Sequence, residues 1–463
     1  WTSSQPFCYS MFFLLIITKT DLIQGKFFIF KKKNSLVIDA ADHSARGGLL
    51  NRRLFLSSAI ATSAALATTR AAYGQEMVGE GQEDWVLYPG SDALEYSNRS
   101  RFEVASVKRL LPNDPQEFLD LRLTKFVART PLDHLMGTIT PNGLHFERSH
   151  QGIPDIDPNK HSLVIHGMVK NPLKFDISAL ENYPTVSRNY YIECSGNSSI
   201  LWQKTPTDQS LQEIHGLLSG SEWTGVLLST LLDECGISSD AKWIIAEGAD
   251  NGMMTRSIPI DKALDDTMIA IRQNGERIRP SQGYPMRLLN PGFEGNTSVK
   301  WLRSIYVSDR PVMSVQETAK YTDMMPDNKA VQFTLEQDVK SIITRPSNAM
   351  SLKKHGLYEI TGLAWSGKGK IARVEVSADG GNTWADAALE GPIHTKMLTR
   401  FRVPWLWEGG SAILQSRAID EFGRIQPTRK ELIDARGRNG IYHFHAVHSW
   451  GVAKSGKIKH VYA

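Results

Sequence analysis

The chain has 463 residues, of which 41% are hydrophobic and 22% charged, a composition typical of a globular protein long enough for two or three domains. Its net charge of +4 arises near the N-terminus: the 53 Lys and Arg divide into nine within residues 1–72 and 44 beyond, and the 49 Asp and Glu into three and 46. The remainder carries no basic stripe interleaved with aromatic residues and no internal repeat. Charge therefore gives no reason to expect a nucleic-acid partner.

Two segments are predicted at the N-terminus. Residues 1–50 begin with Trp1 in place of an initiator, and we expect a gene-model extension there; the apolar run 11–17 is too short to span a membrane. Arg52 and Arg53 precede a mildly apolar, Ala-rich stretch, as in twin-arginine signal peptides. We predict such a signal over 51–74, export of the folded protein to the periplasm, and no membrane segment in the mature form. Two cleavage sites remain open, and a chance arginine pair on a surface helix is the alternative.

The next stretch predicts an irregular segment followed by an α/β domain. Residues 75–135 are expected to be irregular, with a turn at the Pro-Asn-Asp-Pro of 112–115. A mixed domain follows over 136–326, in which an amphipathic helix over 224–235 is expected to stop at Gly236. Its other expected elements are strands at 161–169, 188–193, 243–247 and 299–308 and a short helix from 177.

The pattern changes to all-β over 331–434. Apolar and polar residues alternate there at period two, and Asp-Gly-Gly-Asn at 379–382 indicates a hairpin. Short strands at this spacing predict an immunoglobulin-like sandwich, without the cysteine pair of true immunoglobulin domains. The expected strands cover 341–344, 356–365, 371–377, 399–403 and 412–420. Residues 435–463 are rich in His and aromatic residues and are expected to form a tail that contacts a partner, with metal binding as the alternative.

Cys194 has the most telling position in the chain. It follows a β-type run and precedes a Ser-Gly-Asn turn, so the thiol should lie at the end of a strand, on a loop able to line a cleft. The other two cysteines of the chain are Cys8 and Cys235, and the sequence contains no Cys-x-x-Cys motif. From these observations Cys194 acts alone, as a nucleophile, as a single metal ligand, or as a small buried hydrophobe.

Several motifs surround Cys194 in a recognisable order. These are Phe146–His150, Glu193–Asn197, Glu247–Asp250, Gly283–Leu289 and Pro291–Leu302. Together they resemble the sulfite oxidase family of molybdopterin oxidoreductases. The resemblance implies an α+β fold, in which a mixed α/β molybdopterin-binding domain is followed by an immunoglobulin-like dimerisation domain, and hence a homodimer.

The resemblance also implies the roles of particular residues. Cys194 would be the thiolate ligand of molybdenum, a soft donor suited to that metal. Arg148 would bind the cofactor and orient a sulfur oxyanion. Cationic side chains are natural partners for the phosphate of the pterin cofactor. The residues that would hold the pterin and its phosphate are His150, Asp250, Arg287, Ser298 and Lys300.

Departures from the family pattern point to a particular substrate. Enzymes that oxidise free sulfite typically have two arginines where Ser198 and Ser199 stand, and a small anion needs concentrated positive charge to be desolvated. We therefore expect a substrate other than free sulfite. Three further departures are Gln282 in a place where His is common, Val315 where a catalytic Tyr is usual (with Tyr321 out of register), and no Arg at 405–407.

This pattern favours the SoxC-type, sulfane-dehydrogenase branch of the family. That branch implies oxidation of sulfane sulfur carried by a SoxYZ-type protein during thiosulfate oxidation. The chain has no Cys-x-x-Cys-His, so we expect no haem in it and a SoxD-like c-type cytochrome as electron acceptor. The alternatives are a periplasmic sulfite dehydrogenase that reduces cytochrome c, a molybdenum methionine-sulfoxide reductase, and a cofactor-free binding protein.

Overall fold

The computed structural model describes residues 46–49, 96–104, 106–111 and 126–463. The predicted signal peptide over 51–74, with its arginine pair, lies outside these residues. So does most of the expected N-terminal extension. Among the helices that the structure describes, none combines the length and the apolar character needed to traverse a bilayer.

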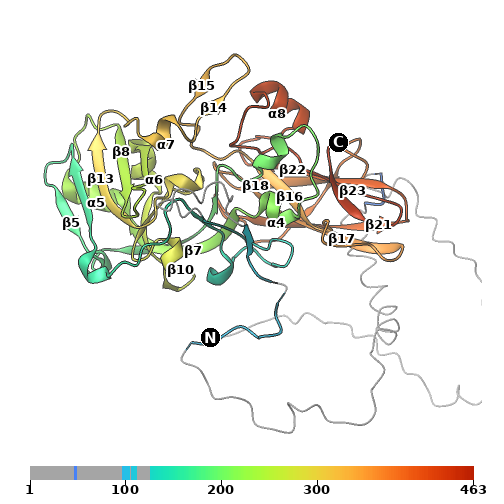
Figure 1. The fold of residues 1–463 in the computed structure, drawn as a ribbon, viewed down its shortest axis with the longest axis horizontal. Coiled ribbons are helices and arrows are strands. Elements are labelled where there is room, and N and C mark those ends of the chain that lie inside the picture. Colours follow the sequence, from blue (N-terminus) through green and yellow to red (C-terminus); the bar gives the residue numbers. More distant parts are fainter. Residues whose placement is uncertain (1–45, 50–95, 105, 112–125) are drawn as a thin grey trace, which may run out of the picture. The chain divides into compact units, whose positions relative to one another are not determined.

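One five-stranded sheet forms the centre of the α/β domain (Figure 1). Its central strand, β13, pairs parallel with β4 and antiparallel with β8, so the sheet is mixed. In spatial order its strands are β5 (Leu173–Phe175), β4 (Leu163–Gly167), β13 (Leu302–Ser308), β8 (Trp243–Gly248) and β9 (Thr255–Pro259). The helices of this region are α3 (Ile177–Glu181), α5 (Leu228–Cys235), α6 (Ile260–Asp265) and α7 (Val315–Thr318). The buried side chains of these strands and of α5 form one apolar core.

A second sheet carries the strand that leads to Cys194. Its strands are β11 (Glu276–Arg277), β10 (Met268–Gln273), β7 (Leu218–Leu227) and β6 (Thr185–Glu193), with β12 (Arg287–Leu289) also on β10. The expected helix over 224–235 is wrong in its first turn, because residues 224–227 end β7: residues 224–226 pair with both β6 and β10, and Leu227 pairs with β10. The helix begins at Leu228 and stops at Gly236, whose φ of 66° allows the left-handed cap predicted for it.

A small third sheet corrects the expectation that residues 75–135 are irregular. It consists of β1 (Arg109–Leu111), β2 (Phe126–Arg129) and β3 (Glu147–Ser149). Hydrogen-bond partners of β2 lie on β3, about twenty residues later, so the sequence around β2 does not predict a strand there. Because Arg148 is the middle residue of β3, this sheet places the first predicted site residue.

The C-terminal domain is the expected β-sandwich (Figure 1). One sheet contains β16 (Lys340–Arg345), β17 (Gly356–Trp365), β21 (Thr399–Trp407) and β20 (Ala388–Leu389). The other contains β19 (Ala385–Asp386), β18 (Ile371–Ser377), β22 (Ala412–Asp420), β23 (Ser449–Val452) and β24 (Ile458–Val461). Trp365, Trp405 and Trp450 are fully buried in its core.

Both ends of this domain differ from expectation. The supposed tail over 435–463 supplies β23 and β24, because β23 completes the hydrogen bonds of β22, and the sandwich therefore extends past residue 434. Its histidines do not form a metal site among the described residues. At the other end, Leu49 pairs with Trp405 and is buried, so residues 46–49 contact the sandwich although the segment 1–50 was expected to lie outside the fold.

The remaining elements are short and lie outside the sheets described above; two of them, β14 and β15, form a two-stranded pair. They are α4 (Leu211–His215), β14 (Asp323–Met324), β15 (Ala330–Val331), α8 (Arg429–Arg436) and the 3₁₀ turns Asn142–Leu144, Pro158–Lys160, Ser199–Trp202, Pro280–Gln282 and Gly295–Thr297.

Candidate active site

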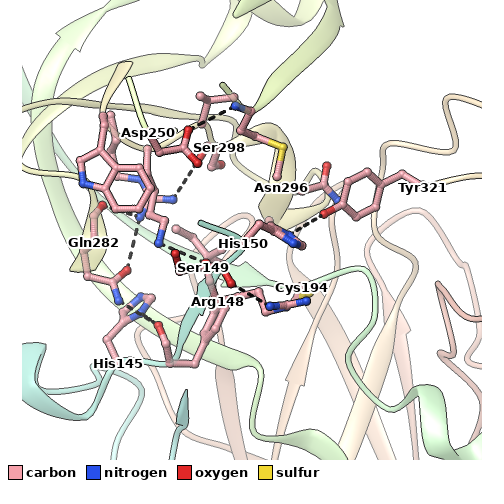
Figure 2. Close-up of a pocket in the computed structure, with 18 residues that line it drawn as sticks. His145, Arg148, Ser149, His150, Cys194, Asp250, Gln282, Asn296, Ser298 and Tyr321 are labelled. Carbon is pink, nitrogen blue, oxygen red and sulfur yellow. Dashed lines mark hydrogen bonds between the residues drawn. The ribbon is translucent and has the colours of Figure 1, made fainter. Parts of the chain in front are cut away.

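A cavity of about 680 Å³, its open mouth included, lies where the ends of several strands meet. The contributing segments are β3, the turn after β6, the loop after β8, and the residues between β12 and β13. All seven residues that the sequence singled out line this cavity (Figure 2). They are Arg148, His150, Cys194, Asp250, Arg287, Ser298 and Lys300. The individual role of each stays a prediction, but the structure brings all of them to one site.

The backbone around Cys194 is fixed on both sides of the thiol. The Cys194 amide donates to the carbonyl of Leu217 at 3.0 Å, and the Asn197 amide closes the turn onto the Cys194 carbonyl at 2.8 Å. Burial raises the pKa of the Cys194 thiol, and the nearby guanidinium groups of Arg148 and Arg129 act in the opposite direction. A metal ion bound to the sulfur would favour the thiolate that burial disfavours.

Two cations that face the cavity have no anionic partner. Arg287 is 3% exposed and donates to the carbonyls of Gln282 and Ser298 at 3.0 and 2.8 Å. Lys300 donates to two other backbone carbonyls, at 2.8 and 3.1 Å. Within the described part of the chain neither forms an ion pair with a carboxylate. Burial lowers the pKa of Arg287 to about 9 and that of Lys300 to about 7, so an anion bound beside them would stabilise their charged forms.

Unpartnered acceptors face the same cavity. The Nδ1 atom of His145 lies 3.0 Å from the carbonyl of Phe146 and must carry the proton, which leaves Nε2 as a lone-pair acceptor. Burial lowers the pKa of His145 to about 3, so the ring stays neutral. Within the described residues this Nε2 and the Oδ1 of Asn296 have no hydrogen-bond partner. Both residues line the cavity, and sequence reasoning missed both.

The donor set fits a phosphorylated pterin with a metal. Two cations without counter-ions match a phosphate, and the orphaned acceptors match the N–H groups of a pterin ring. One soft thiolate matches a metal whose other ligands come from the cofactor. Cys194, Arg287 and Lys300 are thus the residues that would hold the group most directly.

Tyr321 is a site residue whose place the sequence register concealed. Val315, at the position where a catalytic Tyr was sought, is 65% exposed at the start of α7. Tyr321 instead lines the cavity, and its hydroxyl lies 3.3 Å from Nε2 of His150 (Figure 2). Burial raises the pKa of Tyr321, and the guanidinium of Arg256 lies 4.7 Å from the ring centre. Although Tyr321 stands later in the sequence than the expected position, it brings a protonated phenol to the cavity.

The two serines after the Cys194 turn do not line the cavity. The Ser198 side chain is buried and lies 2.7 Å from Nδ1 of His215 and 2.8 Å from Nζ of Lys340. Ser199 begins a 3₁₀ turn. Their lack of charge therefore says little about the charge inside the cavity. Gln282, by contrast, lines the cavity.

Two family models match the chain. One, described as an oxidoreductase molybdopterin binding domain, matches residues 150–316, and the other, a Mo-co oxidoreductase dimerisation domain, matches residues 331–449. They confirm the expected fold class, a mixed molybdopterin-binding domain followed by a β-sandwich dimerisation domain. The second match runs beyond residue 434 and ends at residue 449, where β23 begins.

Known proteins resemble the chain along much of its length. The crystal structure of the sulfane dehydrogenase SoxCD from Paracoccus pantotrophus matches with a TM-score of 0.77 and 38% identity, over 85% of this chain and 99% of that one. Mitochondrial sulfite oxidase of Mus musculus is 30% identical over 68% of this chain and 63% of its own length. An NADH nitrate reductase of Cichorium intybus is 32% identical over 61% of this chain and 34% of its own. The chain thus spans between one third and just under two thirds of these two longer relatives.

Proposed function

The chain belongs to the sulfite oxidase family of molybdopterin oxidoreductases, and from this premise we propose that it oxidises sulfane sulfur held on a SoxYZ-type carrier protein. The observation that carries the proposal is the similarity to the sulfane dehydrogenase SoxCD, which extends over 99% of that chain at 38% identity. The match to sulfite oxidase covers a smaller share of its relative at lower identity.

The residues of the cavity divide the work of such a reaction. Cys194 would ligate the metal, Arg287 and Lys300 would hold the phosphate of the cofactor, and Arg148 would orient the sulfur oxyanion. Tyr321 keeps its proton and can donate a hydrogen bond to a developing oxyanion. When bound, the molybdenum cofactor supplies the oxygen-atom and two-electron chemistry. In each round, water provides one oxygen atom to the sulfur, and two protons and two electrons leave.

The partners form part of the proposal. The electrons pass one at a time to a SoxD-like c-type cytochrome, because the three cysteines of the chain include no haem-attachment motif. The dimerisation domain supports a homodimer of the catalytic chain. Export by the twin-arginine route would bring the folded enzyme to a periplasmic carrier and cytochrome.

A substrate comparison tests the proposal. Purified enzyme containing molybdenum is given carrier protein loaded with sulfane sulfur, free sulfite, or nitrate with a reductant, and cytochrome c reduction or nitrate consumption is followed. We expect kcat/KM for the loaded carrier to exceed that for free sulfite by at least tenfold. The reverse order would establish the alternative, a periplasmic sulfite dehydrogenase. Turnover of nitrate alone would overturn both.

A further inference from the structure

We propose that the dimerisation domain positions the metal ligand Cys194 through two side chains that form hydrogen bonds with residues on either side of it. The residue next to Cys194 is Glu193, the last residue of β6, with a side chain only 3% exposed. Its Oε2 accepts a hydrogen bond from Nε1 of Trp365 at 2.7 Å, and its Oε1 accepts from Nζ of Lys340 at 2.9 Å. Both donors belong to the β-sandwich.

The two donors come from one position of that domain. Lys340 and Trp365 face each other in the antiparallel register of β16 and β17, and the ammonium lies 5.6 Å from the indole centre. A single cross-strand pair therefore reaches both oxygens of Glu193. Within the described part of the catalytic domain, the side-chain amide of Asn197 adds one further hydrogen bond to Oε1 of Glu193, at 2.9 Å.

Lys340 also holds the far end of the turn. Its ammonium donates to Oγ of Ser198 at 2.8 Å, so one side chain bonds to residues on both sides of Cys194. Ser198 has a φ of 68°, in the left-handed region that non-glycine residues seldom adopt, and its backbone is fixed by a hydrogen bond to the carbonyl of Ile214 at 3.0 Å. The contacts of Lys340 and Trp365 thus support a bend in the chain that has an intrinsic cost.

Buried charge in this place calls for a reason other than stability. Lys340 and Glu193 are each 3% exposed, and a buried ion pair contributes little to folding compared with apolar residues of similar size. Outer residues that orient a metal ligand, in contrast, fix the direction of its side chain. Their loss typically lowers metal affinity or activity by about 10–100-fold. Lys340 and Trp365 are accordingly positioning residues, and the domain that pairs two copies of the chain also sets the position of the thiolate.

Two variants and a matched control test this inference in the full-length holoenzyme. Trp365→Phe removes one donor and keeps the aromatic ring, whereas Lys340→Met removes the cation. The control is Lys396→Met, which breaks another ion pair between the same two domains, with Asp266 at 2.5 Å. The carbonyl of Lys396 accepts from the Tyr191 amide at 3.2 Å, and this backbone contact is kept in the variant because only the side chain changes. Molybdenum per chain, the EPR g-values of the half-reduced metal, the dimer mass and the melting temperature are measured for each.

We expect both Trp365→Phe and Lys340→Met to remain dimeric, with molybdenum content reduced at least fivefold or with altered g-values in the metal that remains. Lys396→Met should keep wild-type metal content and spectrum whatever its melting temperature. Wild-type content and g-values in Trp365→Phe and Lys340→Met would overturn the inference, as would equal metal loss in Lys396→Met. If Lys340→Met does not fold, Trp365→Phe alone decides. None of these readouts depends on the substrate, so failure of the sulfane proposal would leave them unaffected.

Discussion

Lys300 gives the sharpest test of the cofactor site, because its replacement should have opposite effects on the empty and the loaded protein. Burial, with repulsion from Arg287 as a smaller cause, lowers the pKa of Lys300 from 10.5 to about 7. At roughly 1.4 kcal/mol for each pKa unit, the difference opposes folding of the cofactor-free protein by up to about 5 kcal/mol. Lys300 retains some exposed surface, so this value is an upper limit.

The direction of the pH effect follows from the proton count. Between about pH 7 and 10.5 the unfolded chain binds more protons at Lys300 than the folded cofactor-free chain does. Stability of the wild-type protein should therefore rise with pH across this window, and the penalty is complete below it. Lys300→Met removes the penalty but leaves two carbonyls without their donor, at a cost of about 1 kcal/mol each, the low end for a side chain that retains some exposed surface. The net gain at pH 7 should therefore be at most about 3 kcal/mol.

The assay uses protein produced in cells unable to make the cofactor. Melting temperatures of wild type and Lys300→Met are compared at pH 7 and pH 9.5, with Arg303→Met as a control because Arg303 is a half-exposed cation paired with Glu247. We expect Lys300→Met to melt a few degrees higher at pH 7, with the gap narrowing at pH 9.5. In cells that make the cofactor, the same variant should lose most of its molybdenum. If cofactor-free Lys300→Met is less stable than wild type at both pH values, the unpaired charge of Lys300 does not destabilise the cofactor-free protein and the reasoning is refuted.

Three further substitutions have definite expected outcomes. Cys194→Ser should remove at least nine tenths of the bound molybdenum, and wild-type loading with full turnover would contradict the ligand assignment. Tyr321→Phe should keep the metal but lower kcat by about fivefold, since it removes a hydrogen bond of roughly 1 kcal/mol beside His150; unchanged kcat would exclude a role for the hydroxyl. Gly225→Ala should unfold the protein or lower its melting temperature by more than 5 °C, because the new Cβ would lie 2.0 Å from a carbonyl oxygen of β10; Gly410→Ala, with open space at that position, is the control.

The local pattern of the chain predicts the sandwich better than the catalytic domain. The strands 356–365, 371–377 and 412–420 have the predicted bounds, because period-two alternation and turn residues mark both their ends. The helix predicted from residue 224 fails at its start, since residues 224–227 gain strand partners from β6 and β10 that are distant in sequence. Strand β23 is missed for the same reason, as its partner β22 lies almost thirty residues earlier.

The residues of the site also fall into those that the sequence predicts and those that only the fold reveals. Residues that belong to ordered motifs, such as Arg148 and Cys194, can be assigned to a common cavity from the sequence. His145 and Tyr321 cannot, because only the fold shows which of their atoms remain unpaired or face the cavity. Nothing in the sequence around Lys340 indicates that it contacts the Cys194 turn. It stands 146 positions after Cys194 in the other domain, and the contact exists only when the two domains have packed together.

The surroundings of Ser198 change what its identity means for the substrate. Its side chain points away from the cavity, toward a cation that Lys340 supplies from the sandwich and that Glu193 neutralises. Neither Ser198 nor Ser199 lines the cavity, so the two serines do not by themselves describe the charge of its lining. Under the proposed function, discrimination between free sulfite and carried sulfane sulfur depends on groups that face the cavity. Among these, Arg148 and Tyr321 interact electrostatically with Cys194. Arg129 lies outside the cavity lining, so Arg148 and a neutral phenol offer an anion less positive charge than several cavity-lining arginines would; this balance, not the serines, is consistent with the proposed delivery of sulfur on a protein arm.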